Sequence, residues 1–132
     1  MPIAPITPEI ARTNRQNWAK IDNLQIITCS GELFNHVDED LPMWSSEGDR
    51  TVTTRIQFYR MFRYPPTITL GVTGLDSSHD QNLRFGLNAI DVTVSGFIIE
   101  FKTWSDTHIA RASVTWQAVE MRKPEIINDA EL

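Results

Sequence analysis

The feature that most restricts the fold is an alternation of apolar and polar residues with a period of two, repeated along most of the chain. In the segment from Thr51 to Tyr59, for example, Ile56 and Phe58 fall on the opposite face from Arg55 and Gln57. Since successive side chains of a β-strand point to opposite faces of a sheet, each such segment is predicted to be a strand with one buried face. The predicted strands cover about residues 24–29, 51–59, 67–72, 83–89, 97–101 and 107–121.

Short turns separate these six strands, and no amphipathic helix lies between them. Parallel sheets need crossover helices, so the pattern predicts an all-β fold, a six-stranded antiparallel β-sandwich. The core face of the fourth strand is predicted to carry Leu83, Phe85, Leu87 and Ala89. That of the last strand is predicted to carry Ala110, Ala112, Val114, Trp116 and Ala118.

The residues before the first strand are predicted to form an arm and a short N-terminal helix. Prolines make Met1 to Thr7 extended, and Thr7 followed by Pro8 is typical of a helix start, with the helix running to about Ile21. The apolar face of this helix is thin, so Trp18 is expected to pack either on its own domain or against helices of other subunits. The predicted organisation is therefore an arm and helix over residues 1–23, a sandwich over 24–122 and a tail over 123–132.

Two connections between the predicted strands are polar. One runs from about Ser30 to Asp49 and is longer than most connections, which makes it a candidate functional loop. The other is the turn from Gly74 to Gln81. Both are expected to leave their polar side chains in solvent.

Composition excludes several classes of protein. The 132 residues suffice for one domain, and 12 basic against 17 acidic residues give a net charge of -5 that argues against nucleic acid as the partner. The longest apolar stretches, such as Gly96 to Phe101, are too short to span a bilayer, so no membrane insertion is expected, and no secretory signal is read at the N-terminus. A single cysteine, Cys29, excludes an internal disulfide and is predicted to be a buried apolar residue.

Catalytic and metal-binding patterns are weak. Ser78, His79 and Asp80 are neighbours in one turn and cannot converge as a triad does, so the chain is predicted not to be an enzyme. His36, His79 and His108 lack metal-ligand spacing, and the acidic run from Asp38 to Asp40 lacks the spacing of a calcium loop. No metal and no cofactor is expected.

Several motifs resemble those of the H-type lectin family, which includes the C-terminal domain of the discoidins and certain invertebrate agglutinins. They are FRYPP at 62–66, TITLGVTGLD at 67–76, QNLR at 81–84, VTVSGFIIEFKTW at 92–104 and SVTWQA at 113–118. The resemblance covers about residues 24–121. It implies six-stranded sandwiches that assemble as homotrimers, bind glycans of the galactose and N-acetylgalactosamine type without a metal, and act outside the cell or at its surface.

The resemblance also implies a sugar site. Arg84 matches the family's sugar-binding arginine, and Trp104 matches an aromatic residue beside the sugar. Glu47, or else Asp49, would supply the carboxylate of the loop, with Glu47 preferred. The remaining site residues of this prediction are Ser46, Ser105 and Asp106.

Each assignment has a structural alternative. Arg84 could instead form a surface salt bridge with Asp76 or Asp80, Trp104 could be buried at the sandwich end or between subunits, and Asp106 could pair with Arg111. The chain also departs from the best-characterised agglutinins, which have a histidine and a tyrosine where Ser105 and Ala110 stand. The predicted function is a multivalent lectin, and the alternative is a structural adhesion or assembly module, the tip or connector of a fibre, that keeps the fold without binding sugar.

Overall fold

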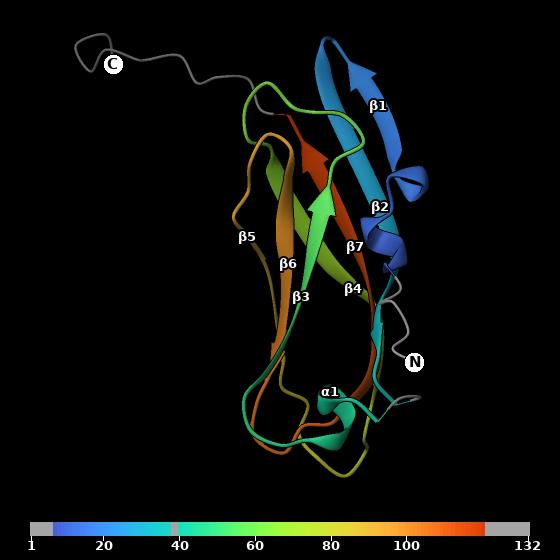
Figure 1. The fold of residues 1–132 in the computed structure, drawn as a ribbon, viewed down its shortest axis with the longest axis vertical. Helices are drawn as coiled ribbons and strands as arrows, with labels where there is room; N and C mark the ends of the chain where they lie inside the picture. Colours follow the sequence, from blue (N-terminus) through green and yellow to red (C-terminus); the bar gives the residue numbers. More distant parts are fainter. Residues whose placement is uncertain (1–6, 38–39, 121–132) are drawn as a thin grey trace, which may run out of the picture.

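Two antiparallel β-sheets packed face to face make up the protein in the computed structural model, which describes residues 7–37 and 40–120 (Figure 1). The larger sheet has the strand order β1-β2-β7-β4 and the smaller one β3-β6-β5. The all-β antiparallel sandwich is therefore confirmed, but the described residues form seven strands where six were predicted. The strands are β1 (Asn17–Ile21), β2 (Leu24–Asn35), β3 (Arg50–Gln57), β4 (Thr67–Ser77), β5 (Gly86–Ile90), β6 (Gly96–Thr103) and β7 (Ile109–Val119).

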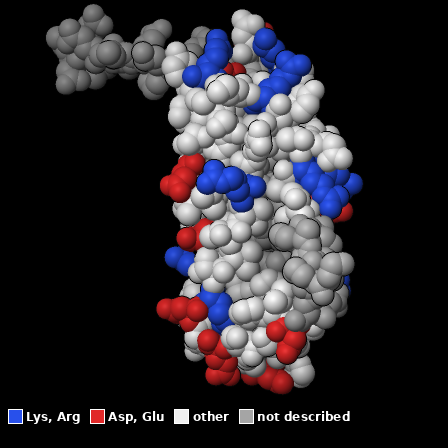
Figure 2. All heavy atoms as spheres, viewed as in Figure 1, with Lys and Arg blue, Asp and Glu red and all other residues white. Residues whose placement is uncertain are grey.

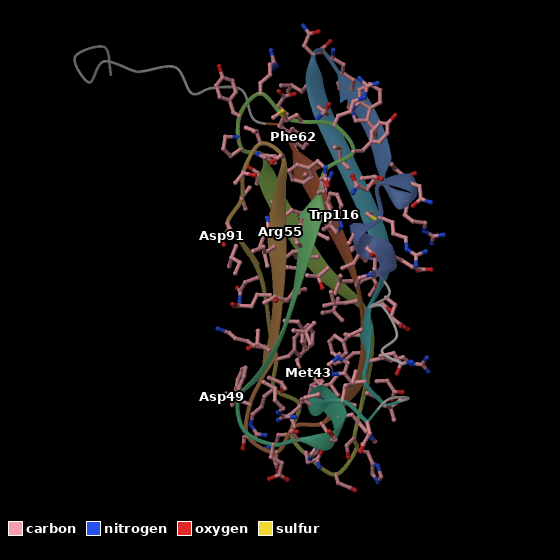
Figure 3. The ribbon with its side chains drawn as sticks, in the orientation of Figure 1. Met43, Asp49, Arg55, Phe62, Asp91 and Trp116 are labelled. Atoms are coloured by element: carbon pink, nitrogen blue, oxygen red, sulfur yellow. The ribbon has the colours of Figure 1, made fainter. Side chains whose placement is uncertain are left out.

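The core lies between the two sheets and follows the alternation in the sequence. Trp116 on β7 is fully buried, and its ring packs edge-on against Phe97 of β6 with 5.4 Å between centroids. In Figure 3, Trp116 and Phe62 lie toward one end of the sandwich and Met43 toward the other. The predicted core residues of the last strand, Ala110, Ala112, Val114, Trp116 and Ala118, are all at most 3% exposed.

The largest differences from the predicted strand boundaries are in β2, β4 and β5. Strand β2 continues to Asn35, beyond the predicted loop start at Ser30, because Leu33 and Phe34 add two buried side chains to the core. Strand β4 likewise runs to Ser77 through residues predicted to be a turn. Strand β5 begins only at Gly86, and Leu83, predicted to face inward, is 49% exposed.

The predicted N-terminal helix over Pro8 to Ile21 is wrong. Its place is taken by two short 3-10 turns, Glu9–Ala11 and Thr13–Arg15, followed by strand β1. Asp22 and Asn23 both have positive φ, of 48° and 70°, and form the two-residue turn that folds β1 back onto β2. Turns of this kind match the twist of a hairpin, which explains why a strand forms here.

The segment before β1 packs into the sandwich. Ile10 is fully buried, and its carbonyl accepts a 2.7 Å hydrogen bond from the indole Nε1 of Trp116. Gly31 on β2 makes room for this segment, since a Cβ at position 31 would lie 2.8 Å from the Cβ of Glu9. Cys29 is buried as predicted, and burial raises the pKa of its thiol, opposed by the charge of Arg15. The arm up to Ile6 and the tail after Glu120 fall outside the described residues.

The two ends of the sandwich differ, and we name them for what they carry. The α1 end comprises the short helix α1 (Pro42–Ser45) and the connecting residues 46–49, 78–85 and 104–108. The hairpin end comprises the turns 22–23 and 91–95, the loop 58–66 and Glu120. Figure 1 shows the α1 end at the bottom and the hairpin end at the top.

Candidate functional site

Three connections that cross from one sheet to the other meet at the α1 end. They follow β2, β4 and β6, and hydrogen bonds tie the last two together. The backbone N–H of Ser78 donates to the carbonyl of His108 at 3.0 Å, and the hydroxyls of Thr103 and Thr107 donate to the carbonyls of Arg84 and Asn82. Residues far apart in sequence are thus held at one edge of the molecule.

The 46–49 loop joins the same assembly through the main chain. The N–H of Gly48 donates to the carbonyl of Ser105 at 2.8 Å. Gly48 has a φ of 81° and Ser105 a φ of 61°, so both sides of this contact use the left-handed region of backbone space. This region favours glycine, so the Ser105 conformation is uncommon and is retained by its surroundings.

Arg50, the first residue of β3, bonds to two of these connections, the ones that follow β2 and β6. Its side chain is 7% exposed and donates to the carbonyls of Pro42, Met43, Gly48 and Ser105, at distances from 2.9 to 3.5 Å. Burial lowers the pKa of the guanidinium, and the carboxylates of Glu47 and Asp49 act in the opposite direction. Arg50 therefore fixes α1, the 46–49 loop and the 104–106 turn relative to one another.

Arg84 lies at the surface of this assembly. Its Nη1 donates to a carboxylate oxygen of Asp106 at 2.7 Å and to the hydroxyl of Thr107 at 3.3 Å. Every hydrogen bond that the side chain of Arg84 makes within the described residues uses Nη1, which leaves its Nε and Nη2 donors to solvent or a ligand. The arginine is thus oriented by the chain and still able to donate.

An indole and three carboxylates complete the rim. Trp104 is 41% exposed, and it lies between Thr103, which bonds to the backbone of Arg84, and Ser105, which bonds to Gly48 and Arg50. The carboxylates of Glu47, Asp49 and Asp106 are all exposed. Figure 3 shows Asp49 on the loop that leads from α1 into β3.

His108 supports the 46–49 loop from the β7 side. Its Nδ1 lies 2.6 Å from the carbonyl of Trp44, and because a carbonyl only accepts, this nitrogen carries the proton. The other ring nitrogen, Nε2, lies 3.7 Å from a carboxylate oxygen of Glu47. The imidazole thus connects α1 to the carboxylate that the sequence favours for the site.

The structure brings the seven predicted site residues to one end of the molecule. The predicted alternative of a salt bridge from Arg84 to Asp76 or Asp80 is wrong, because Arg84 pairs with Asp106, and Arg111 pairs with Asp76 at 3.8 Å. Trp104 is exposed, and Ala110 is buried on β7. Ser46 is half-buried, and its N–H donates to the carbonyl of Pro42.

Two residues with clear structural roles at this end, Arg50 and His108, were not assigned to the site from sequence. Burial of an arginine that bonds to main-chain carbonyls, as Arg50 does, leaves no pattern in the sequence. In the sequence, His108 is only one of three histidines that lack metal-ligand spacing. Its position two residues after Asp106, in the turn that carries the site, is the one available signal.

The arrangement combines guanidinium donors, carboxylate acceptors and an exposed aromatic ring, which suits a ligand rich in hydroxyl groups.

Within residues 7–37 and 40–120, no three histidine, cysteine or acidic side chains lie together as a metal site would require. The helices of this part of the chain are also too short and too polar to cross a membrane.

Comparison with known proteins agrees with the fold. Residues 53–119 match the family model of the H-type lectin domain. The chain is 36% identical over 87 residues to "ATP synthase subunits region ORF 7" of Fuscovulum blasticum, an alignment that covers 66% of this chain and 76% of that protein.

Among solved structures, the chain is similar to wild-type discoidin II from Dictyostelium discoideum, with a TM-score of 0.67 and 20% sequence identity. That match covers 79% of this chain and 39% of discoidin II. A second structure, the recombinant native discoidin II, matches equally well, with a TM-score of 0.67. This chain therefore spans about two fifths of the length of the discoidin chains it matches.

Proposed function

We propose that this chain, which belongs to the H-type lectin family, binds glycans of the galactose and N-acetylgalactosamine type and has no enzymatic activity. The observation that supports this most is the meeting of three inter-sheet connections at the α1 end, where Arg84, Trp104 and the 46–49 loop share one rim. A sugar offers hydroxyls that donate and accept and a patch of C–H groups that packs on an aromatic ring.

Each of the seven residues has a proposed role in holding the sugar. The unused Nε and Nη2 donors of Arg84 bond to a ring or acetamido oxygen, while Nη1 stays on Asp106. The indole of Trp104 packs against the apolar face of the ring. Hydroxyl hydrogens of the sugar are accepted by Glu47, with Ser46, Asp49, Ser105 and Asp106 as further polar contacts.

A single shallow site of this kind binds weakly, so we propose that the chain acts as a homotrimer on surfaces that display many sugars, outside the cell or at its surface. Linked sites raise the overall affinity through effective concentration without any new contact. A mass measurement in native buffer tests this, and a monomer at micromolar concentration would count against it.

A glycan array tests the proposed function directly. The wild-type chain is expected to bind galactose-type glycans, and Arg84→Ala is expected to lose most of that signal. Arg55→Ala is the matched control, because Arg55 is exposed on β3, opposite Ile98 on the outer face of the smaller sheet. An array without signal from the wild-type chain would contradict the lectin proposal and favour a structural adhesion or assembly module that has kept only the fold.

A further inference from the structure

Negative charge collects at the α1 end. The segments 40–50, 78–85 and 104–108 contain five carboxylate residues, Asp40, Glu47, Asp49, Asp80 and Asp106, against two arginines, Arg50 and Arg84. Figure 2 shows the acidic side chains gathered at the lower end of the molecule and basic ones at the upper end. A ligand that approaches the proposed sugar site therefore meets an excess of carboxylates.

Both arginines of this end are already engaged. Arg50 is buried and directs its donors to four main-chain carbonyls. Arg84 holds the carboxylate of Asp106 at 2.7 Å, and this pair has no net charge. Recognition of an anionic group in proteins normally relies on an exposed arginine or lysine whose charge is not already balanced, and in these three segments Arg50 is buried and Arg84 is paired with Asp106.

The carboxylate of Glu47, in contrast, is largely open. Its side chain is 71% exposed, and its one partner within the described residues is the Nε2 of His108, at 3.7 Å. The neighbouring carboxylate of Asp49 is also exposed. A positively charged group on a ligand would find these oxygens available. A negatively charged group could reach only the Nε and Nη2 donors of Arg84, beside the carboxylate of Asp106, which repels it.

We infer that the α1 end selects glycans by charge. It favours sugars that carry a protonated amino group over neutral sugars, and it rejects sugars that carry a carboxylate or a sulfate. This inference rests on the proposed function, because it assigns a ligand class to the same site. It predicts that the natural ligands are amino sugars without an acetyl group, such as those of partly deacetylated polymers, rather than acidic glycans.

The size of the effect follows from the exposure of the groups. An exposed ion pair contributes little, so one amino group is expected to tighten binding by about two- to fivefold, and one carboxylate to weaken it by at least as much. Such interactions are screened by salt, since the Debye length falls from about 30 Å at 0.01 M to about 3 Å at 1 M. The preference is therefore expected to shrink as salt is added.

A matched series of sugars tests the inference with the full chain. Galactosamine and N-acetylgalactosamine differ from galactose only at C2, and galacturonic acid differs from it only at C6. Each sugar is displayed on the same neutral polymer. At about 0.01 M salt the expected order of affinity is galactosamine, then the two neutral sugars, then galacturonic acid, with the differences mostly lost at about 1 M. The corresponding gluco series is measured in parallel.

A charge-neutral variant gives the control. Glu47→Gln together with Asp49→Asn is expected to bring the affinities for galactosamine and galacturonic acid closer together. The readout is the ratio of these two affinities, because both side chains also contact the sugar in the proposed site and galactose binding falls with them. Galacturonic acid binding as tightly as galactose to the wild-type chain would overturn charge selection and leave the lectin proposal standing. Binding of none of the sugars in either series, in either salt, would overturn both.

Discussion

The two ends of the sandwich each use an arginine to join distant segments, in different ways. At the α1 end, Arg50 is buried and bonds only to main-chain carbonyls. At the hairpin end, Arg63 is exposed and donates to the carboxylate of Glu120 at 2.8 Å, and Glu120 also accepts the N–H of Gln25. The buried charged side chain is therefore an arginine at the α1 end and a glutamate at the hairpin end.

This difference affects what each end leaves at the surface. Because Arg50 neutralises no specific carboxylate by hydrogen bonding, Glu47 and Asp49 remain exposed beside it. At the hairpin end Glu120 is buried. Besides Asp22 and Asp91 on the two turns, the surface there shows arginines and large apolar side chains. These include Trp18, which has the guanidinium of Arg60 over its ring at 4.5 Å, and also Ile21, Tyr59, Met61 and Tyr64.

Among the substitutions that test this difference between the two ends, replacing Arg50 is expected to have the largest effect on stability and binding. Arg50→Met leaves four carbonyls of the α1 end without their donor, so the free energy of unfolding is expected to fall by about 3 kcal/mol, and glycan binding to fall with it. Urea denaturation measures the first and the array the second. Arg55→Met, on the exposed face of the same strand, is expected to change neither stability nor binding. An equal loss in both variants would show that the stabilisation does not come from the hydrogen bonds of Arg50.

The hairpin end should respond to acid through Glu120. Burial raises the pKa of this carboxyl, but the hydrogen bonds from Arg63 and from the N–H of Gln25 outweigh it, so the folded-state pKa lies below the ordinary value of 4.5. Such a group stabilises the fold above its unfolded pKa, and this contribution disappears as pH falls through the folded pKa.

Glu120→Gln is therefore expected to cost about 1 kcal/mol at neutral pH and to lose less stability than the wild type on acidification below pH 4.5. Thermal unfolding as a function of pH measures this. Glu100→Gln, on the outer face of the smaller sheet, provides the control, because its ion pair with Lys102 spans 3.8 Å. Identical acid profiles for the wild type and Glu120→Gln would contradict the assignment.

Two tryptophans of nearly equal exposure test whether the hairpin end serves stability and the α1 end serves binding. Trp18 is 37% exposed and Trp104 is 41% exposed, but Trp18 packs under Arg60 and donates to the side chain of Gln25 at 2.8 Å. Trp18→Ala is expected to lower the free energy of unfolding by about 1 kcal/mol and leave glycan binding unchanged. Trp104→Ala should do the reverse, with under about 0.5 kcal/mol lost and binding reduced. If both variants changed the same property, the two ends would not have separate roles.

The sequence predicted the layers of this fold better than its N-terminal part. Strands β3 and β7 have one buried face, so their period of two is complete, and their core residues follow from it. In β1 all five residues are exposed, which leaves no apolar periodicity to read. Thr7 and Pro8 suggested a helix, although Asp22 and Asn23, just before the strand-forming residues that begin at Leu24, were a local signal for a turn.

The candidate site was predictable in composition and place, because the resemblance to the H-type lectins identifies residues at the ends of strands. Its wiring was not. The pairing of Arg84 with Asp106, and the bond from Arg50 to the carbonyl of Ser105, join residues 22 and 55 positions apart. Such contacts depend on where connections cross between sheets, which residue spacing alone does not specify.

The contact between the indole of Trp116 and the carbonyl of Ile10 has a practical consequence for anyone who trims this protein. The region of family similarity starts at Thr53, yet a truncation that begins there, or even at Leu24, removes the acceptor of a buried N–H and the side chain that fills the space beside it. A shortened version intended for expression or fusion should therefore start before Glu9, because the boundary of detectable similarity is not the boundary of the unit that folds.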